Sequence, residues 1–184
     1  MNQLVFHDDG SLEGLNTDVP GLSASLAEAG IVVAGKPVVV LGAGGAARAA
    51  LVALRAMGAG EVRVLNRSAG RMLIGAVARS LEDWPQAAAD AVLVVHATGA
   101  GMKGAPPLSV DLAKLPGTAA VCDMVYNPLE TDLLKQARAL GLRTVDGLGM
   151  LMHQAVPAFR AFFGVDPKVT PALRQMLDEA LRGG

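Results

Sequence analysis

A glycine-rich stretch between an apolar run and an alanine-rich run constrains the fold of this chain more than any other feature. Residues 38–41 are continuously apolar and mainly β-branched, which predicts a short buried strand. Residues 46–57 are rich in alanine and predict a helix, which Gly58 and Gly60 would end. The residues that join the two elements are Gly42, Ala43, Gly44, Gly45, Ala46 and Ala47. A strand, a tight turn and a helix in this order predict a parallel α/β sheet.

The spacing of the glycines fits the turn that binds the pyrophosphate of a dinucleotide, which reads Gly-x-Gly-x-x-Gly or Ala. Gly42 would permit the tight turn, Gly44 would let the backbone approach the pyrophosphate, and Ala47 would allow close helix packing. Free N–H groups and the positive end of the helix favour a negative charge there. An ordinary glycine-rich turn is the alternative interpretation. The predicted cofactor contacts are Gly42, Ala43, Gly44, Gly45 and Ala46.

The rest of the chain alternates between strand-like and helix-like segments. Further strands are predicted at residues 61–65, 91–95, 119–124 and 143–145, and helices at residues 16–30, 132–140, 149–163 and 171–181. Thr17 or Asp18 can cap the first helix, and Thr170 the last. Residues 68–85 offer few positions for both a helix and a returning strand. The alternation predicts an α/β fold, a Rossmann-type doubly wound, mainly parallel sheet with helices on both faces.

Composition and charge exclude several classes of protein. Apolar residues make up 52% of the chain but aromatic residues only 3%, which favours helices packed on a sheet over a β-sandwich. The 16 Lys and Arg residues are balanced by 17 Asp and Glu, so no broad positive field would hold nucleic acid. The single Cys122 is expected to be a buried, inert thiol, and no Cys/His spacing indicates a metal. Since neither a signal peptide nor a membrane span is indicated, we expect a soluble cytoplasmic protein.

The end of the second predicted strand indicates which dinucleotide would bind. NAD-binding domains usually have Asp or Glu here for the ribose hydroxyls, whereas this chain has Asn66, Arg67 and Ser68, followed by Arg71. Guanidinium groups offer planar donor pairs to phosphate oxygens, while an acidic side chain would repel them. Two solvated surface arginines are the alternative interpretation. We predict that these four residues bind the 2′-phosphate of NADP.

Several separated motifs, taken together, resemble the shikimate dehydrogenase family. The most specific is the run at residues 146–154, Asp-Gly-Leu-Gly-Met-Leu-Met-His-Gln. The other matching segments are residues 16–18, 42–46 and 66–68, Ala97 and Thr98 with Gly101 and Met102, and Asp123 with residues 126–129. The chain therefore resembles this family from its substrate-linker region to its C-terminus.

The resemblance implies NADPH-dependent reduction of 3-dehydroshikimate to shikimate, a step of chorismate and aromatic amino acid biosynthesis. Hydride would pass from nicotinamide C4 to the ketone carbon while an acid supplies the proton. Asp18 matches the Asp of the family's catalytic Lys and Asp pair. The substrate-binding positions match Asn2, Asp18, Tyr126 and Gln154, and further cofactor-binding positions match Ala97, Thr98, Met124, Gly147 and Met150.

Without the family, several of these side chains have simpler interpretations. Asp18 is also a good helix cap, Gln154 a polar helix residue and Tyr126 a phenol beside a turn. His153 is predicted to lie at the surface or behind the site rather than to act as a base. His7 is predicted to lie in a polar turn.

The chain departs from the family pattern in three respects. The family's N-terminal lobe, which carries the catalytic Lys and paired Ser residues, would precede Met1, and no Lys of this chain lies in a matching motif. His96 stands where the family tends to have Asn. Residues 66–96 are several residues short, which predicts a trimmed second helix beside the adenine pocket and weaker adenosine binding. From the first departure we expect the chain alone to bind NADPH but to reduce 3-dehydroshikimate very slowly.

The resemblance also divides the chain into three parts. Residues 1–35 would be a remnant of the substrate-lobe linker with a connecting helix, residues 36–165 the NADP-binding domain, and residues 166–184 a C-terminal helix that packs back. The alternative functions are a non-catalytic NADP-binding module or shortened paralogue, and a quinate/shikimate dehydrogenase. The expected partners are the small-molecule substrate and, through exposed apolar surface, a second copy in a homodimer, with no nucleic acid or membrane.

Overall fold

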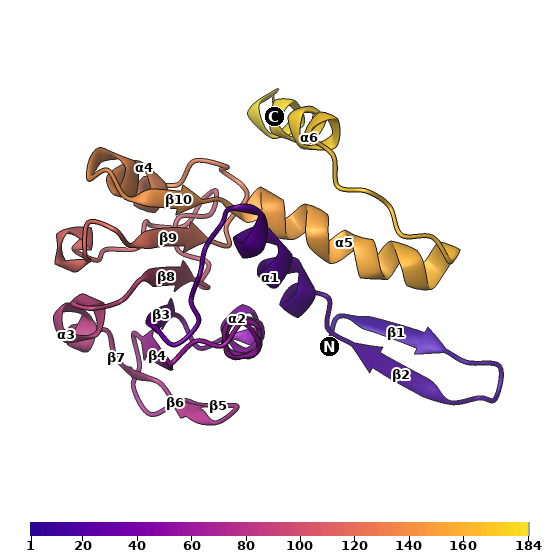
Figure 1. Cartoon of the computed structure of the whole chain (residues 1–184), viewed down its shortest axis with the longest axis horizontal. Helices are drawn as coiled ribbons and strands as arrows, with labels where there is room; N and C mark the ends of the chain where they lie inside the picture. Colours follow the sequence, from indigo (N-terminus) through magenta and orange to yellow (C-terminus); the bar gives the residue numbers. More distant parts are fainter. Residues whose placement is uncertain (184) are drawn as a thin grey trace.

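The computed structural model describes residues 1–183, and a six-stranded parallel sheet runs through its centre (Figure 1). The strands, in their order across the sheet, are β10 (Arg143–Val145), β9 (Ala120–Asp123), β8 (Leu93–His96), β3 (Pro37–Leu41), β4 (Glu61–Asn66) and β7 (Arg79–Ser80). All neighbouring strands in this sheet are parallel. If these six strands are numbered 1 to 6 in chain order, their order across the sheet is 6-5-4-1-2-3. This is the order of two mononucleotide-binding halves, which meet where β3 lies beside β8. The predicted Rossmann-type sheet is confirmed.

Helices cover both faces of the sheet, and each face has its own apolar core (Figure 1). One face carries α1 (Asp18–Glu28), α2 (Gly45–Ala56) and α5 (Gly147–Phe163), and the other carries α3 (Trp84–Ala88) and α4 (Asp132–Ala139). Side chains alternate along β3, so Val38 and Val40 belong to the first core and Val39 and Leu41 to the second. A strand buried on both faces explains why residues 38–41 are continuously apolar.

The helix boundaries agree with the sequence pattern, but the capping of α1 does not. Thr17 occupies the N-cap position of α1, yet its side chain makes no capping hydrogen bond. Instead, its amide donates to Asn2 Oδ1 at 2.9 Å, and the Asp18 amide donates to Asn16 Oδ1 at 3.0 Å. Thr17 therefore occupies the predicted N-cap position but does not cap through its side chain, and Pro20, the third residue of the helix, has no N–H to donate to it. At α6 (Pro171–Gly183), the Leu173 amide donates to Thr170 Oγ1 at 3.2 Å, as predicted.

The segment after β4 forms a small hairpin rather than the trimmed helix that its length suggested. Strands β5 (Met72–Leu73) and β6 (Ala76–Val77) pair antiparallel before β7 joins the main sheet. Arg55 of α2 donates to the carbonyl oxygens of Ile74 and Gly75 at 2.6 and 2.7 Å and so fixes the hairpin tip. Gly70 and Gly75 have positive φ angles of 83° and 65°, which suit tight turns and not a helix.

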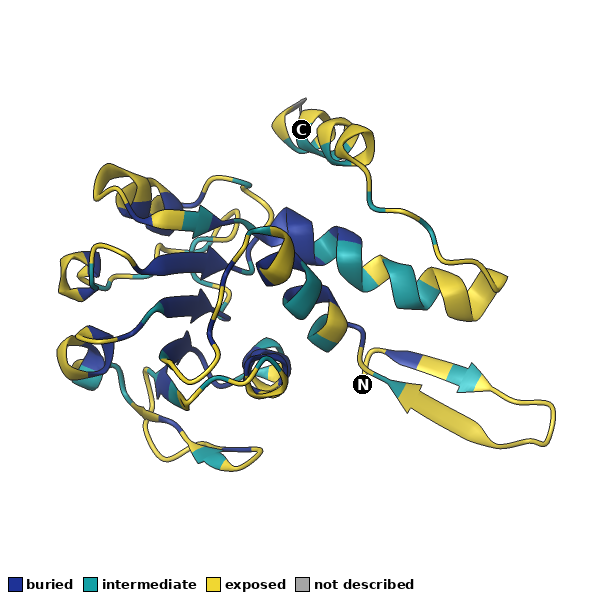
Figure 2. Cartoon of the chain, viewed as in Figure 1, coloured by how far each residue is buried: buried dark blue, intermediate teal, exposed yellow. Residues whose placement is uncertain are grey.

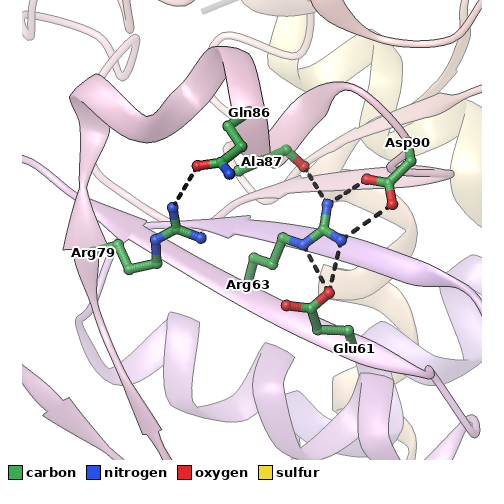
Figure 3. Close-up of polar contacts among 6 residues, drawn as sticks. All are labelled: Glu61, Arg63, Arg79, Gln86, Ala87 and Asp90. Atoms are coloured by element: carbon green, nitrogen blue, oxygen red, sulfur yellow. Dashed lines mark hydrogen bonds and ion pairs between the residues drawn. The ribbon is translucent and has the colours of Figure 1, made fainter.

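Arg63 ties β4 to the helix layer on the second face of the sheet (Figure 3). Its Nε and Nη2 donate to Glu61 Oε2 at 2.9 and 2.7 Å, and its Nη1 donates to the Ala87 carbonyl of α3 at 2.9 Å. Both carboxylate oxygens of Asp90 also accept from this guanidinium. The hydrogen bonds to Asp90 and Glu61 raise the pKa of Arg63, and those from Arg63 lower the pKa of both carboxyl groups.

A second hairpin, which the sequence patterns did not predict, lies apart from the main sheet. Strands β1 (Gln3–Phe6) and β2 (Leu12–Leu15) pair antiparallel and extend away from the body in Figure 1. His7 begins the polar turn between them, as predicted, since the Gly10 amide donates to its carbonyl at 2.9 Å. Most of this hairpin and of α6 is exposed (Figure 2). No helix within residues 1–183 has the length and apolar character needed to cross a bilayer.

Candidate cofactor and substrate site

Gly42 is where the carboxyl ends of three strands meet. Its amide donates to Leu65 O of β4 at 2.7 Å, and its φ of 115° is unfavourable for any other residue. A Cβ atom at this position would lie 2.7 Å from Ala97 O and 2.8 Å from Thr98 Cγ2, both directly after β8. The backbone of the turn therefore touches the loop that follows β8, and only glycine allows this approach.

Gly44 and Gly45 serve no packing purpose within residues 1–183. A Cβ atom built on either residue would meet no other atom within 4 Å. Gly44 is the N-cap of α2, has φ −87° and ψ −163°, and provides no side-chain cap for the first N–H groups of the helix. Free N–H groups beside open space at the start of a twelve-residue helix suit a pyrophosphate. The turn thus fits the dinucleotide that the sequence indicated.

This turn also lies at the point where the sheet changes direction. From β3, the chain builds outward to β4 and β7 on one side, and then returns to add β8, β9 and β10 on the other. Ligands of open α/β sheets bind in the crevice beyond the carboxyl ends of the strands at such a switch point. Gly42, in contact with Ala97 and Thr98, lies at this switch point.

The predicted phosphate-binding residues follow the adjacent strand, β4. Asn66 ends β4 and donates through Nδ2 to Ser68 O at 3.0 Å, which folds the chain back on itself. Arg67 and Arg71 are exposed, and neither guanidinium group forms a hydrogen bond or ion pair with another residue in the described range. Ala78 anchors Arg71 at the base of the hairpin, because its amide donates to Arg71 O at 2.9 Å. Both guanidinium groups are therefore available to an external anion.

The three residues predicted to lie near a nicotinamide come together from β9 and α5. Gly147 begins α5 so close to the end of β9 that a Cβ atom would lie 2.5 Å from Met124 O and 2.6 Å from Val125 O. Met150, one turn further along α5, is buried in the core against which Met124 packs. Val19, next to Asp18, packs against the same core. The residues predicted for the nicotinamide and those predicted for the substrate therefore border the same apolar core.

Three of the four predicted substrate residues converge at the start of α1. Asn2 Nδ2 donates to Asp18 Oδ1 at 3.0 Å. Gln154 of α5 lies against Gly21, one turn after Asp18, where a Cβ atom on Gly21 would be 2.8 Å from Gln154 Cβ. Tyr126, in contrast, is 42% exposed in the loop after β9 and makes no hydrogen bond to these three residues in the described structure. The structure therefore groups Asn2, Asp18 and Gln154 but does not bring Tyr126 to them.

Comparison with known proteins decides the family. The shikimate dehydrogenase (NADP(+)) of Methylobacterium radiotolerans is 50% identical over 194 residues, which cover 100% of this chain and 69% of the relative. The enzyme of the same name from Acidiphilium cryptum is 48% identical over 188 residues, covering 100% of this chain and 67% of the relative. The chain belongs to the shikimate dehydrogenase family. It spans about two thirds of the length of these relatives. No model of a known protein family matches it.

Solved structures of shikimate and quinate dehydrogenases share the fold. Shikimate 5-dehydrogenase from Thermus thermophilus, in complex with NADP(H) and shikimate, is 38% identical and has a TM-score of 0.78 over 97% of this chain and 66% of that one. Quinate dehydrogenase from Corynebacterium glutamicum, in complex with NAD, is 33% identical and has a TM-score of 0.82 over 98% of this chain and 67% of that one. The resemblance predicted from the motifs is confirmed.

Behind the family's cofactor crevice lies a buried polar network that the sequence patterns did not predict. His96 ends β8 and Asp123 ends β9, their side chains are 1% and 0% exposed, and His96 Nδ1 lies 2.8 Å from Asp123 Oδ1. Thr98 Oγ1 lies 2.6 Å from His96 Nε2, and Thr131 Oγ1 donates to Asp123 Oδ2 at 2.6 Å. The register pairs His96 with Asp123 across the two strands. Two polar residues at the ends of adjacent apolar strands were the signal in the sequence that could have revealed this contact.

Cys122 and a charged cleft near α6 contribute nothing to this site. Burial raises the pKa of the Cys122 thiol far above its usual range, with a smaller contribution from Asp123, so the thiol is inert as predicted. A cleft of about 520 Å³ lies between α4, the start of α5 and α6. Its three arginines, Arg138, Arg174 and Arg182, each pair with a carboxylate. The cleft contains none of the predicted site residues.

Proposed function

We propose that this chain carries the NADP(H) site and one wall of the substrate site of an enzyme that reduces 3-dehydroshikimate to shikimate. The observation that carries the proposal is the glycine turn at the switch point, with Gly42 closed on the loop after β8 and Gly44 open to a ligand. The identity to enzymes named shikimate dehydrogenase (NADP(+)) supports the reaction, although the chain spans only about two thirds of their length. Arg67 and Arg71, exposed and unpaired within residues 1–183, support NADP over NAD.

Each group of residues has a separate task in this proposal. The N–H groups at Gly44 and Gly45 bind the pyrophosphate, and Arg67 and Arg71 bind the 2′-phosphate. When bound, NADPH supplies the hydride that reduces the substrate ketone. An apolar wall that excludes water from the hydride transfer is formed by Met124, Gly147 and Met150. This role is assigned to them because Met124 follows β9 and the other two lie in the first turn of α5, which packs on it.

Asp18 orients the substrate in the proposed site. Asn2 holds Oδ1 of Asp18 through a hydrogen bond of 3.0 Å, so the remaining acceptor positions of this carboxylate are free for a substrate hydroxyl. Gln154, held beside α1 by Gly21, offers an amide to a second polar group of the substrate. An ionised carboxylate only accepts hydrogen bonds, so the proton that completes the reduction must come from another donor.

The test is calorimetric titration of the chain with NADPH, NADH and shikimate, followed by an assay of 3-dehydroshikimate reduction. Tighter binding of NADPH than of NADH is expected. Binding without turnover would favour a non-catalytic NADP-binding module. The similarity to a quinate dehydrogenase in complex with NAD makes oxidation of quinate with NAD the second candidate reaction. If this oxidation is faster than the reduction of 3-dehydroshikimate with NADPH, the second candidate is the better assignment.

Arg67→Ala is expected to remove most of the preference for NADP(H). A lost charge-assisted hydrogen bond costs about 1.5 to 3 kcal/mol, or roughly tenfold to a hundredfold in affinity. The loss should appear in titrations with NADPH and be absent with NADH. Arg160→Ala, which changes an exposed arginine at the far end of α5, is the matched control. Equal affinity of the unmodified chain for both dinucleotides would contradict the assignment.

The proposal extends to location and assembly. A net charge of −1 supports an enzyme that works without nucleic acid or an anionic membrane, and the single free cysteine, which is buried, fits the reducing cytoplasm. A homodimer is supported by exposed aromatic side chains at the end of α5, where Phe159, Phe162 and Phe163 are 42%, 71% and 66% exposed. Analytical ultracentrifugation across a range of concentrations tests the dimer, and a monomer throughout would exclude it.

A further inference from the structure

We propose that His96 is a positioning residue for the cofactor, because it connects Asp123 to Thr98 and so holds the loop at residues 98–101 against the glycine turn. His96 is buried and has no access to substrate, so its role is to orient Thr98 and not to react. The inference rests on the proposed function, since the crevice matters only when a dinucleotide occupies it.

The hydrogen bonds assign one arrangement of protons to the network. Asp123 Oδ1 accepts from His96 Nδ1 at 2.8 Å and from the Val125 amide at 3.0 Å, so Nδ1 carries the imidazole proton. Nε2 of His96 lies 2.6 Å from the Thr98 hydroxyl, which donates to it in the tautomer that has its single proton on Nδ1. The oxygen of that hydroxyl in turn accepts from the Ala100 amide at 3.1 Å. Both ring nitrogens have a partner, which fixes the ring and the rotamer of Thr98.

This rotamer decides which part of Thr98 packs on the glycine turn. Its hydroxyl is engaged by His96 and Ala100, and its methyl group packs on Gly42, where a Cβ atom would lie 2.8 Å from Thr98 Cγ2. At the other end of the loop, Gly101 lies beside Thr131, whose hydroxyl donates to Asp123 Oδ2 at 2.6 Å. One oxygen of the Asp123 carboxylate therefore acts on the start of the loop through His96 and Thr98, and the other fixes Thr131, which lies beside the far end.

The network belongs to the nicotinamide side of the crevice. Asp123 directly precedes Met124, and its Oδ1 also holds the Val125 amide, which sets the backbone that packs on Gly147. The arginines proposed for the 2′-phosphate follow β4, which β3 separates from β8 in the sheet. Disturbing the network should therefore change contacts to the nicotinamide half and spare those to the adenosine half.

The test uses Thr98→Val, which keeps the branched shape and the methyl contact but removes the hydroxyl. NADPH and 2′,5′-adenosine bisphosphate, which contains only the adenosine half, are titrated well below the melting temperature. NADPH affinity should fall about tenfold, and affinity for the bisphosphate should stay within about twofold, as expected for one lost buried hydrogen bond. Hydrogen exchange of the Ala100 amide, which loses its acceptor, should accelerate in the ligand-free chain.

Two further variants complete the experiment. Thr98→Ser keeps the hydroxyl and should restore slow exchange at Ala100 and most of the NADPH affinity, whereas His96→Leu should behave like Thr98→Val. A folded Thr98→Val chain that binds NADPH as tightly as the unmodified chain overturns the proposal, and so does equal loss of both ligands. If the unmodified chain binds neither ligand, the proposed function fails. In that case, unchanged exchange at Ala100 in Thr98→Val would separately overturn the positioning by His96.

Discussion

Two glycines of one turn are required for different reasons. Gly42 has a φ of 115° and lies against Ala97 O, so the protein itself requires glycine there. Gly44 has an ordinary extended conformation and open space beside it, so nothing within residues 1–183 requires glycine. The proposed pyrophosphate would account for glycine at Gly44, and this difference between the two glycines can be measured.

We expect Gly42→Ala to lower the free energy of unfolding by about 2 kcal/mol or more, because the backbone is strained and the Cβ atom meets a carbonyl oxygen. Gly44→Val should lower the free energy of unfolding by only about 1 kcal/mol, since its backbone angles suit any residue and valine is a poorer N-cap than glycine. Its NADPH affinity should nevertheless fall on the order of a hundredfold, because the side chain occupies the space of the pyrophosphate. Denaturant unfolding and calorimetry measure the two quantities. A Gly44→Val chain that binds NADPH normally would place the pyrophosphate elsewhere.

The guanidinium of Arg63 connects a strand with the helix that follows it. Arg63→Met should lower the free energy of unfolding by about 1 kcal/mol near neutral pH, since the Ala87 carbonyl and two carboxylates lose a donor that is only 14% exposed. The pKa values of Glu61 and Asp90 are lowered in the folded chain, so their stabilising effect is complete above their unfolded values and is lost as the pH falls through the folded ones. The difference between the two chains should therefore shrink below about pH 4.

Urea unfolding at neutral and acidic pH measures this difference. Arg182→Met removes an exposed ion pair within one helix, between Arg182 and Asp178, and provides the control. Its effect on stability should be close to zero at both pH values. A difference between Arg63→Met and the unmodified chain that does not depend on pH would show that packing, and not the carboxylates, holds β4 to α3.

The central strands and their helices could be predicted from the sequence because their patterns are local. A buried parallel strand needs a continuous apolar run, and β3 has one. The two hairpins lacked such a signal, because residues such as Phe6 and Ile74 are apolar yet exposed. Their pairing depends on distant contacts, such as the bonds from Arg55 to the tip of the β5–β6 hairpin.

The glycine turn could be predicted from the sequence pattern, whereas the substrate-side residues and the buried His96–Asp123 contact could not. The glycine turn could be predicted from the spacing of its glycines and from its place between a strand and a helix. The structure confirms a tight turn there, with Gly42 against Ala97. The grouping of Asn2 with Asp18 followed only from the family resemblance, since no local pattern joins residues of a hairpin and a helix. The buried contact between His96 and Asp123 was overlooked because it depends on the register of two strands that are distant in sequence.

Helices α1 and α5, which are far apart in the sequence, pack against each other on one face of the sheet (Figure 1). Gly21→Ala should separate these helices, because the new Cβ atom would lie 2.8 Å from Gln154 Cβ and 2.9 Å from its amide nitrogen. We expect a loss of about 1 to 3 kcal/mol in the free energy of unfolding, typical of overpacking, with NADPH binding retained. Gly117→Ala, where a Cβ atom meets nothing within 4 Å, is the control. Unchanged stability in Gly21→Ala would mean that α1 moves freely over α5.

The same contact sets an order of assembly. Closing Gly21 on Gln154 encloses a loop of about 130 residues, whose entropy cost must be met before the contact contributes. The unit of α1, β3, α2 and β4 is local and can form while the chain is still being synthesised, but the contact of α1 with α5 must wait until α5 has been made. Gln154 therefore reaches α1 late in folding. A substrate that bridges them would bind only the finished fold, and would delay the separation of the two helices when the chain begins to unfold.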